Sequence, residues 1–403
     1  MAPKSPLFAD LTPFYPDPSL TKVIRSKVGG KLEEKKVFNL NHPDVVNMMR
    51  YVYVGCYLPT DEESYRHRMG IDDRVKDVVA DQVNLMVASY GDIQADNKDF
   101  YDKAWTGLVD LAGKIWNYAD SVGGDIDSAV YVAILKAVSD YHDKDKTKKD
   151  KEEARQTIIW YTKKMVDDIG DLQVASQSSR DKLHKFKAAT TAHGVTLRDN
   201  DNAVKKVMEG KDGEIERLEK DIKDLQGQLS AEHDELSYDL KVATTTPAYA
   251  WCTIFGFIAA ITVASIYGEK IRKLKKLMKE TEGEIETEVK ELEAARTVCT
   301  DSQRMAAGAE ALIALVEPAI TAIGELETAW QTMKDLLGGL HDVAKMNPDD
   351  IPNVRTEENE LKRLVHKWTD FKVCVNEYRA SAYISQPEIL SLQEWAKKYC
   401  PEE

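Results

Sequence analysis

Residue types that can carry out catalysis are present in the chain, but their spacing forms no known catalytic or metal-binding pattern. The eight histidines are His42, His67, His142, His184, His193, His233, His341 and His366. No His-Glu-x-x-His motif, phosphate-binding glycine loop or nucleophile elbow occurs. The run Tyr141-His142-Asp143 could pair a base with an orienting carboxylate, but its charged surroundings indicate a surface histidine. The sequence therefore predicts no enzyme activity and no metal site.

The cysteines likewise form no motif. They are Cys56, Cys252, Cys299, Cys374 and Cys400. Their number is odd, they are widely separated, and no Cys-x-x-Cys occurs, so neither a disulfide framework nor a zinc site is predicted. We expect no cofactor, and synthesis in a reducing cytosol.

The chemistry that the sequence does support is insertion into lipid. Residues 248–267 (AYAWCTIFGFIAAITVASIY) carry no charge, and the uncharged run extends over 242–268. About 20 residues at 1.5 Å each cover the hydrocarbon core of a bilayer. Large apolar side chains would surround a helix formed by this run, and aromatic residues lie near both of its ends. The side chains predicted to enter the membrane are Tyr249, Trp251, Ile254, Phe255, Phe257, Ile258, Ile261, Val263, Ile266 and Tyr267.

A cluster of basic residues follows the apolar run. It comprises Lys270, Arg272, Lys273, Lys275, Lys276 and Lys279. These cations are predicted to bind anionic lipid headgroups, at about 1 kcal/mol each near the surface. The alternative is a solvated helix face paired with the acidic residues of 280–293. Because the whole chain has a net charge of −14, we expect no binding to nucleic acid, and only local contact with a membrane.

The elements that must position these residues are nearly all helices. Five of the 13 prolines lie in the first eighteen residues, which predicts an irregular N-terminal arm over 1–40. Apolar residues spaced three and four apart predict helices over 45–57, 75–90, 101–118 and 128–141, with tryptophans packed inside the bundle. A longer helix follows, with a break predicted near His193-Gly194 and at 200–202. Its expected buried seam is Ile158, Met165, Ile169, Leu172, Leu183 and Phe186.

Sevenfold spacing typical of coiled coils lies on both sides of the apolar run, in arms over 204–240 and 269–298. Polar residues interrupt the long helical seams, and we interpret them as marks of faces that a partner chain covers; they are Ser176, Ser179 and Glu232. Beyond the second arm, a helix over 302–337 is predicted to kink at Pro318 and to end at Gly338-Gly339. Further helices are expected over 356–383 and 387–399.

The topology of the apolar run decides how the two arms can be used. A single spanning helix would put the arms on opposite sides of the membrane, where they could not pair. If the run folds back, with hinges at Pro247, Gly256 and Gly268, the arms become neighbours and form an antiparallel stalk. We favour this hairpin. A third possibility is a core helix buried within a soluble domain.

Long helices flanking an apolar insert between two heptad arms resemble the cytolysin A superfamily of α-helical pore-forming toxins. The length and order are most similar to the larger component of the binary alpha-xenorhabdolysin type. The resemblance implies an all-α fold, an elongated multi-helix tail bundle with a long antiparallel coiled-coil stalk ending in an apolar hairpin foot. The parts would be the arm 1–40, tail helices 41–200, the stalk 201–300 with its foot 242–268, and returning and C-terminal helices 301–403.

The resemblance also implies a mode of action. A secreted, soluble monomer would expose its foot at a target-cell membrane and assemble with a smaller second toxin subunit into a homo- or hetero-oligomeric ring. Residues 1–14 lack the pattern of a secretory signal peptide, so we expect export by an unconventional route or by lysis. The alternatives are a membrane-resident coiled-coil tether with one span and a soluble coiled-coil scaffold.

Overall fold

The computed structural model describes residues 10–28, 31–41, 43–71, 73–207, 284–354 and 357–381. Contacts along the chain divide it into two compact units. The first unit comprises Met1–His42, Ala104–Lys182 and Ala319–Tyr383. The second comprises Pro43–Lys103, Leu183–Pro318 and Ile384–Glu403. Each unit therefore combines segments that are distant in the sequence, whereas the division at residues 40, 200 and 300 stays a prediction.

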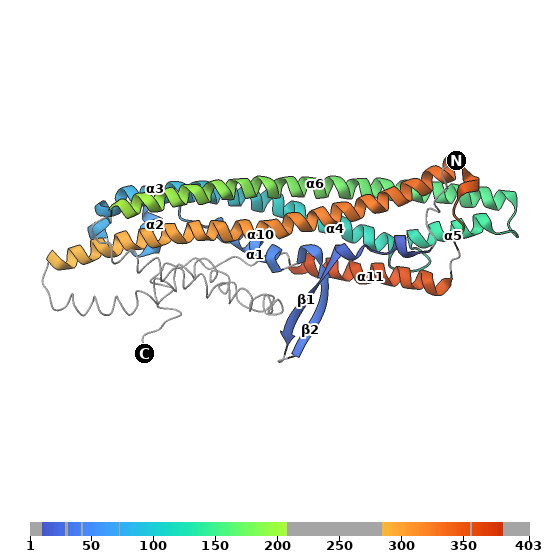
Figure 1. The fold of residues 1–403 in the computed structure, drawn as a ribbon, viewed down its shortest axis with the longest axis horizontal. Coiled ribbons are helices and arrows are strands. Elements are labelled where there is room, and N and C mark those ends of the chain that lie inside the picture. Colours follow the sequence, from blue (N-terminus) through green and yellow to red (C-terminus); the bar gives the residue numbers. More distant parts are fainter. Residues whose placement is uncertain are drawn as a thin grey trace. The chain divides into compact units, whose positions relative to one another are not determined.

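The described residues are predominantly helical, as the sequence predicted, and Figure 1 shows the helices that form the two units. The first unit contains α4 (Thr106–Val122), α5 (Val130–His142) and α11 (Glu358–Ser381). It also contains the first part of α6 (Lys148–Val207) and the last part of α10 (Glu284–Met346). At the start of α6, Thr147 and Asp150 exchange hydrogen bonds between side chain and backbone N–H, which satisfies donors that the helix leaves unpaired.

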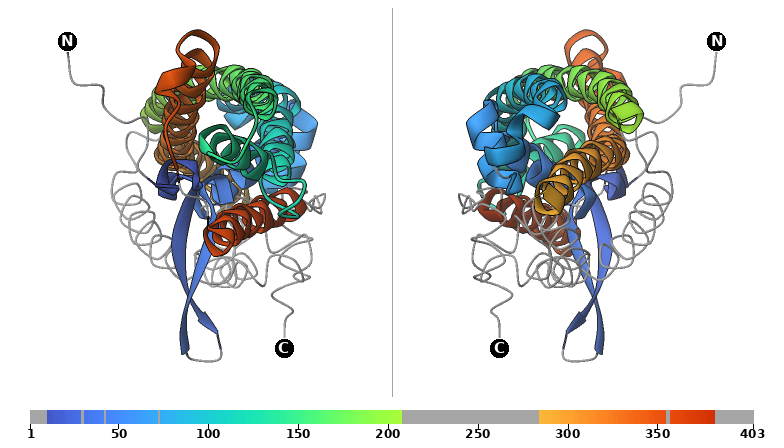
Figure 2. Two further views of the ribbon diagram at one scale, coloured as in Figure 1. Left: turned by 90° about the vertical axis from the view of Figure 1, so that its right-hand side faces the viewer. Right: turned by 90° about the vertical axis from the view of Figure 1, so that its left-hand side faces the viewer.

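The N-terminal segment differs from the irregular arm that the prolines predicted. Strands β1 (Thr21–Val28) and β2 (Lys31–Phe38) pair antiparallel, with Thr21 opposite Phe38. The sequence signal is a Gly-Gly pair between two runs that contain β-branched residues. Figure 2 shows this hairpin projecting from the helices of the first unit. Phe38 anchors its base, because its ring is fully buried and lies 6.0 Å from Phe371 and 5.6 Å from Tyr378.

The core of the first unit is aromatic. Trp330 and Trp368 are fully buried, and the ring of Tyr118 lies 5.4 Å and 5.7 Å from them. The indole of Trp368 donates a 2.8 Å hydrogen bond to the Phe14 carbonyl, so the N-terminal segment is packed into this core. The prediction that tryptophans serve internal packing fails at Trp160, which is 60% exposed.

The second unit contains α1 (Pro43–Gly55), α2 (Glu62–Met69) and α3 (Ala80–Phe100), together with the C-terminal part of α6 and the N-terminal part of α10. The predicted break in α6 is wrong, since the helix runs unbroken to Val207. Gly194 lies inside this continuous helix, and a Cβ at this position would make an ordinary contact of 3.6 Å with the Ala309 Cβ. Asn200 donates a 2.8 Å hydrogen bond to the Ser89 hydroxyl within the unit, so it joins two helices and does not end one.

Helix α10 is also longer than predicted. It continues past Pro318 and through Gly338-Gly339 to Met346. Leu337 and Leu340 on either side of the glycine pair are fully buried. Glycine costs about 1 kcal/mol in a helix, which burial of two leucines at about 1.5–3 kcal/mol each outweighs. The predicted kink at Pro318 stays a prediction, and the predicted helix over 387–399 lies outside the described residues.

The predicted seam of α6 is confirmed, since all six of its apolar residues are buried. The interpretation of the two serines in that seam is wrong. Ser176 and Ser179 are 0% and 2% exposed within the chain, so they do not mark a face open to a partner. Ser179 instead faces α4 within the chain, since a Cβ at Gly107 of α4 would lie at an ordinary contact distance of 3.8 Å from its hydroxyl. Glu232 lies outside the described residues.

Candidate membrane-insertion site and its flanking helices

The residues predicted to meet the membrane all fall between 208 and 283, outside the described part of the chain. This holds for the inserting side chains of 249–267, the hinges Pro247, Gly256 and Gly268, and the basic cluster of 270–279. Among the described residues, the one stretch long and apolar enough to span a bilayer is Asp301–Met346, and half of its apolar window is buried. This stretch is the core part of α10, so its hydropathy is explained by packing. The candidate site is therefore characterised through the helices that lead into it.

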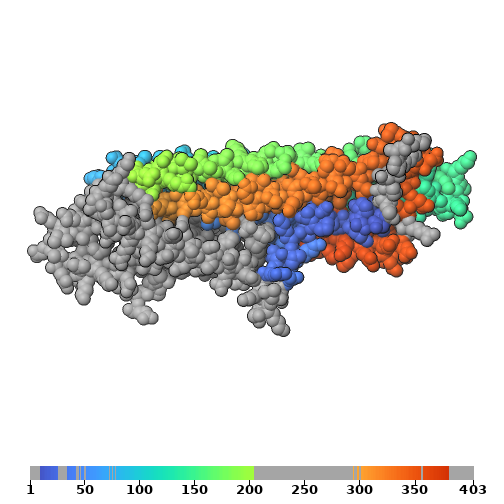
Figure 3. All heavy atoms as spheres, viewed as in Figure 1, coloured from blue at the N-terminus to red at the C-terminus, as the bar shows by residue number. Residues whose placement is uncertain are grey.

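The two helices that flank the apolar run are antiparallel neighbours in the second unit. The Ser302 hydroxyl donates a 3.0 Å hydrogen bond to the Leu197 carbonyl. Arg198 pairs with Glu310, and farther from the run Lys187 pairs with Glu317. Positions that descend along α6 thus meet positions that ascend along α10, and Figure 3 shows the two helices lying against each other. Val207 and Glu284, the last described residue of α6 and the first of α10, consequently lie at the same end of this helix pair.

The same antiparallel register holds in the first unit. Arg155 donates a 2.7 Å hydrogen bond to the Ala344 carbonyl, and Arg180 forms a 2.7 Å ion pair with Glu327. The Glu327 side chain is largely buried, and burial raises the pKa of its carboxyl while Arg180 lowers it. In each unit, α6 and α10 therefore run antiparallel to each other. The end of the pair formed by Val207 and Glu284 is the one nearer in sequence to the apolar run.

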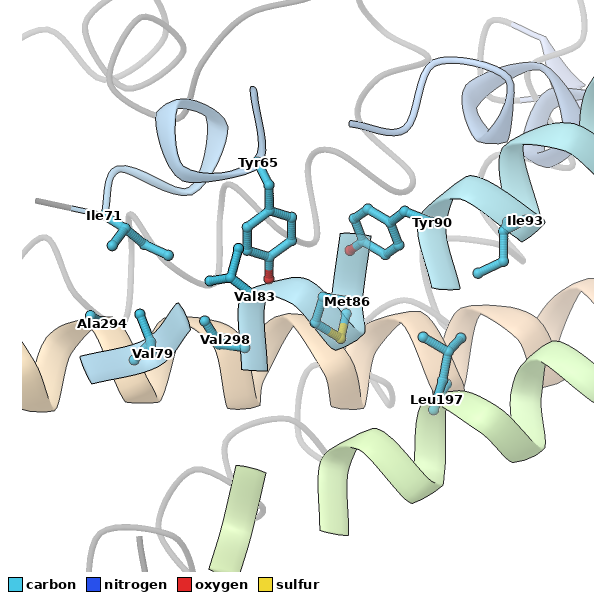
Figure 4. Close-up of a cluster of buried hydrophobic side chains, with 11 residues drawn as sticks. Tyr65, Ile71, Val79, Val83, Met86, Tyr90, Ile93, Leu197, Ala294 and Val298 are labelled. Carbon is cyan, nitrogen blue, oxygen red and sulfur yellow. The ribbon is translucent and has the colours of Figure 1, made fainter. Parts of the chain in front are cut away.

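A buried carboxylate of α10 forms hydrogen bonds with side chains of α2 and α3 in the second unit. Asp301 is 4% exposed, and its Oδ2 accepts hydrogen bonds of 2.7 Å from Tyr65 and 2.6 Å from Tyr90. Figure 4 shows the two tyrosines between α10 and the helices that carry them. Tyr65 comes from α2 and Tyr90 from α3, so a single side chain of α10 joins three helices.

The electrostatics of this Tyr65–Asp301–Tyr90 cluster follow from its burial. Burial raises the pKa of Asp301 above its usual value, and the two tyrosine hydrogen bonds and the positive charges of Arg304 and Arg68 oppose the rise. The pKa values of Tyr65 and Tyr90 are raised well above the usual value, first by burial and then by the neighbouring carboxylate. The tyrosines are thus neutral donors at physiological pH.

Apolar side chains surround the cluster and extend it along the helices. The buried set comprises Tyr65, Ile71, Val79, Val83, Met86, Tyr90, Ile93, Leu197, Ala294, Val298 and Ala306. Figure 4 shows Ala294 and Val298 of α10 beside Val79 and Val83. The set includes Leu197 of α6 and Ala294, Val298 and Ala306 of α10, so this packing joins the two flanking helices to α2 and α3.

Two of the described histidines contact backbone carbonyls of other segments. The His142 Nε2 lies 2.8 Å from the Ile351 carbonyl, and the His341 Nδ1 lies 3.1 Å from the Ile159 carbonyl. Within the described ranges, no group of three or more histidine, cysteine, aspartate or glutamate side chains could hold a metal ion. Burial raises the pKa of the Cys56 thiol to about 12 and also raises the pKa of Cys374, so neither is a ready nucleophile.

Comparison with known proteins identifies the fold. No family model and no curated protein matches the sequence. Among solved structures, the chain is similar to soluble SmhB of the tripartite alpha-pore forming toxin Smh from Serratia marcescens. The identity is 10%, the match covers 89% of this chain and 97% of SmhB, and the TM-score is 0.50.

Two further structures match with lower scores. Soluble AhlB of the tripartite toxin AHL from Aeromonas hydrophila gives 11% identity, a TM-score of 0.49, and coverage of 88% of this chain and 98% of AhlB. The HblL1 toxin component of Bacillus cereus gives 11% identity, a TM-score of 0.46, and coverage of 87% and 97%. The likeness to SmhB extends over nearly the whole of both chains, so it concerns the complete fold. The more specific likeness to the binary alpha-xenorhabdolysin type stays a prediction.

Proposed function

We propose that this chain, which shares the fold of SmhB, is one component of an α-helical pore-forming cytolysin. The main support for the proposal is the antiparallel packing of α6 and α10, because it brings together the helices that precede and follow the uncharged run 242–268. Because Val207 and Glu284 lie at the same end of this pair, a segment that joins them and contains the run can project as a hairpin foot. SmhB belongs to a tripartite alpha-pore forming toxin, which supports the assignment of this fold to pore formation.

The foot is proposed to bind the target membrane, and the basic cluster to hold the adjoining helix at the headgroups. Burial of a large apolar side chain contributes about 1.5–3 kcal/mol. A charge at the bilayer centre costs about 2.5–3.5 kcal/mol on the insertion scale. The apolar residues therefore supply the binding energy, and the cations of 270–279 determine a preference for anionic lipid.

The chain is proposed to be soluble before it meets the membrane and to act there with a second protein. A charged content of 31% suits a soluble state that conceals the foot. SmhB and AhlB are both components of tripartite toxins. By analogy, this chain assembles with a partner subunit into an oligomeric ring. Ser176 and Ser179 of α6 are buried inside the chain and are not the partner-binding face.

The second candidate function is that of a membrane-resident tether. The antiparallel packing of α6 and α10 argues against this function. A single span would place Val207 and Glu284 on opposite sides of a membrane. The contacts between Ser302 and Leu197, and between Arg198 and Glu310, require the two flanks to lie together. A tether would also fractionate with membranes from synthesis onward and would require detergent for purification.

The deciding experiment is dye leakage from liposomes, with protein purified without detergent and with extracts that contain candidate partner subunits. We expect Phe257→Asp to reduce liposome binding by roughly a hundredfold, from the cost of a charge in the bilayer. The matched control is Val174→Asp, because Val174 of α6 is 72% exposed and tolerates a charge. If Phe257→Asp unfolds the soluble protein while Val174→Asp does not, the run is a core helix and the toxin proposal fails.

A further inference from the structure

The β1–β2 hairpin is basic, although the chain as a whole is acidic. Residues 21–38 contain six lysine or arginine residues and two glutamates, whereas the whole chain has a net charge of −14. Figure 2 shows the hairpin projecting from the helices of the first unit. Val23 and Lys36 lie opposite each other in the strand register, so they share one face, and both are exposed. Lys36 forms no ion pair with any residue in the described ranges, so its charge is open to a partner.

Only the base of the hairpin is supported by the rest of its unit. Phe38 packs on Phe371 and Tyr378 of α11, and Lys35 forms a 2.9 Å ion pair with Glu377 of the same helix. No third strand pairs with β1 or β2 in the part of the chain that the structure describes. An isolated two-stranded hairpin is at best marginally stable in water, and lysines on its strands repel a second basic hairpin. A partner that covers this element would therefore be acidic.

Exposed carboxylates lie at the opposite end of α11. Figure 1 shows the hairpin beside the C-terminal half of α11, and the start of α11 close to the end of α10. The exposed carboxylates of this second surface are Asp342, Asp349, Glu357 and Glu360. None of these four forms an ion pair with a residue that the structure describes. Glu358 between them is paired with Lys362 and is not counted. We call this surface the acidic end.

The basic hairpin and the acidic end are too far apart to neutralise each other within one chain. Helix α11 has 24 residues and is therefore about 36 Å long. The Debye length is about 8 Å at physiological ionic strength, so salt screens their attraction inside a single molecule. Two different surfaces with opposite charge can instead meet between copies. Such a head-to-tail contact is the type that generates rings.

We propose that the basic hairpin of one copy binds the acidic end of a second copy of this chain. The inference rests on the proposed assembly into a ring, because that assembly brings copies together. Exposed ion pairs are individually weak and are screened by salt. The contact therefore leaves the protein monomeric in dilute solution and forms where a membrane concentrates the copies.

The test places a photo-crosslinking benzophenone side chain at Val23, which is 61% exposed, in full-length protein bound to liposomes. Nitrogen-15-labelled and unlabelled copies are mixed, so that an adduct containing both isotopes joins two copies. We expect mass spectrometry to map this adduct to peptides between Asp342 and Glu360 of the other copy. Its yield should fall as the salt concentration rises.

A charge swap shows whether these two surfaces recognise each other. Lys36→Glu and Glu360→Lys each place like charges at the contact, and each should lower the yield of the adduct between copies about tenfold. The double variant restores opposite charges between copies and should recover most of the yield, which an unfolded protein could not do. Lys76→Glu is the matched control, because it makes the same charge change at an exposed lysine of the second unit. Asp342→Lys replaces Glu360→Lys if that variant fails to fold, since a cation is favourable near the end of α10.

The outcomes separate this contact from the proposed membrane function. Adducts confined to one chain or to lipid overturn the contact. So do single variants that match the wild type, or a double variant whose yield stays low. Cosedimentation with liposomes is scored separately for every protein. If the wild type does not cosediment, the membrane function fails, and the same crosslinking in concentrated solution at low salt decides whether the contact exists.

Discussion

At the scale of single residues, Asp301 matters most among the described side chains because it is a buried carboxylate with two neutral donors. Removing the acceptor and removing only the charge have different consequences. Asp301→Leu leaves the hydroxyls of Tyr65 and Tyr90 buried without a partner, at about 1–3 kcal/mol for each. Asp301→Asn keeps an oxygen in place and removes the charge that burial disfavours. We expect urea unfolding to show a large loss of stability for Asp301→Leu and about 1 kcal/mol or less for Asp301→Asn. Equal losses would contradict the role of the tyrosine hydrogen bonds.

The pKa shift of Asp301 makes a second prediction at this scale. Its folded-state pKa is raised, so the folded protein binds a proton more readily than the unfolded chain between the usual aspartate pKa and the raised value. Stability from this group therefore increases as the pH falls from neutral through that window, and decreases as the pH rises. Unfolding measured at neutral and mildly acidic pH should show this gain in wild type relative to Asp301→Asn. The same pH response in both proteins would contradict it.

At the scale of elements, the antiparallel pairing of α6 and α10 predicts how the arms beyond it are arranged. The described helices approach the apolar run side by side, so we predict that the arms 204–240 and 269–298 continue the pairing. Cysteines placed near Leu236 and Leu274, on a background without native cysteines, should crosslink within a monomer. The products are separated by size on a denaturing gel. Crosslinks found only between chains would refute the hairpin.

The β1–β2 hairpin gives a further prediction for an element. Phe38 joins the base of the hairpin to α11 through Phe371 and Tyr378. Phe38→Ala should destabilise the protein by about 3–5 kcal/mol, because a fully buried ring is lost from an aromatic core. The control is Val23→Ala, since Val23 on the same hairpin is 61% exposed and its loss should cost little. Similar unfolding midpoints for the two variants would show that the base of the hairpin is not part of the core.

At the scale of the whole molecule, the proposed function predicts that lysis requires a second protein and that capture by lipid depends on charge. This chain alone should bind liposomes without releasing dye, and a smaller helical partner should restore release. Removing the cations Lys270, Arg272, Lys273, Lys275 and Lys276 should weaken binding to anionic lipid, most at low salt, where screening is least. Cosedimentation at two salt concentrations measures this effect. Full lysis by this chain alone on protein-free liposomes would favour a one-component toxin.

The sequence by itself determined the features that depend on neighbouring residues. Three-and-four spacing predicts α5 within two residues of its ends, the helix expected over 356–383 agrees equally well with α11, and sevenfold spacing identifies Ile158, Met165 and Leu172 as buried. The apolar run is likewise evident from composition alone. These features are local because helix periodicity and hydropathy are properties of a short window.

Only the tertiary structure decided what distant residues do to one another. Tyr65 and Asp301 are 236 positions apart, and nothing in a short window marks either residue. Gly194 and Gly338-Gly339 were expected to interrupt helices, yet α6 and α10 are continuous there, and Leu337 and Leu340 beside the glycine pair are fully buried. Ser176 and Ser179 likewise proved to be contacts within the chain. The physical reason is that the free energy of tertiary burial exceeds a local preference of about 1 kcal/mol, and only the folded structure shows which residues are buried together.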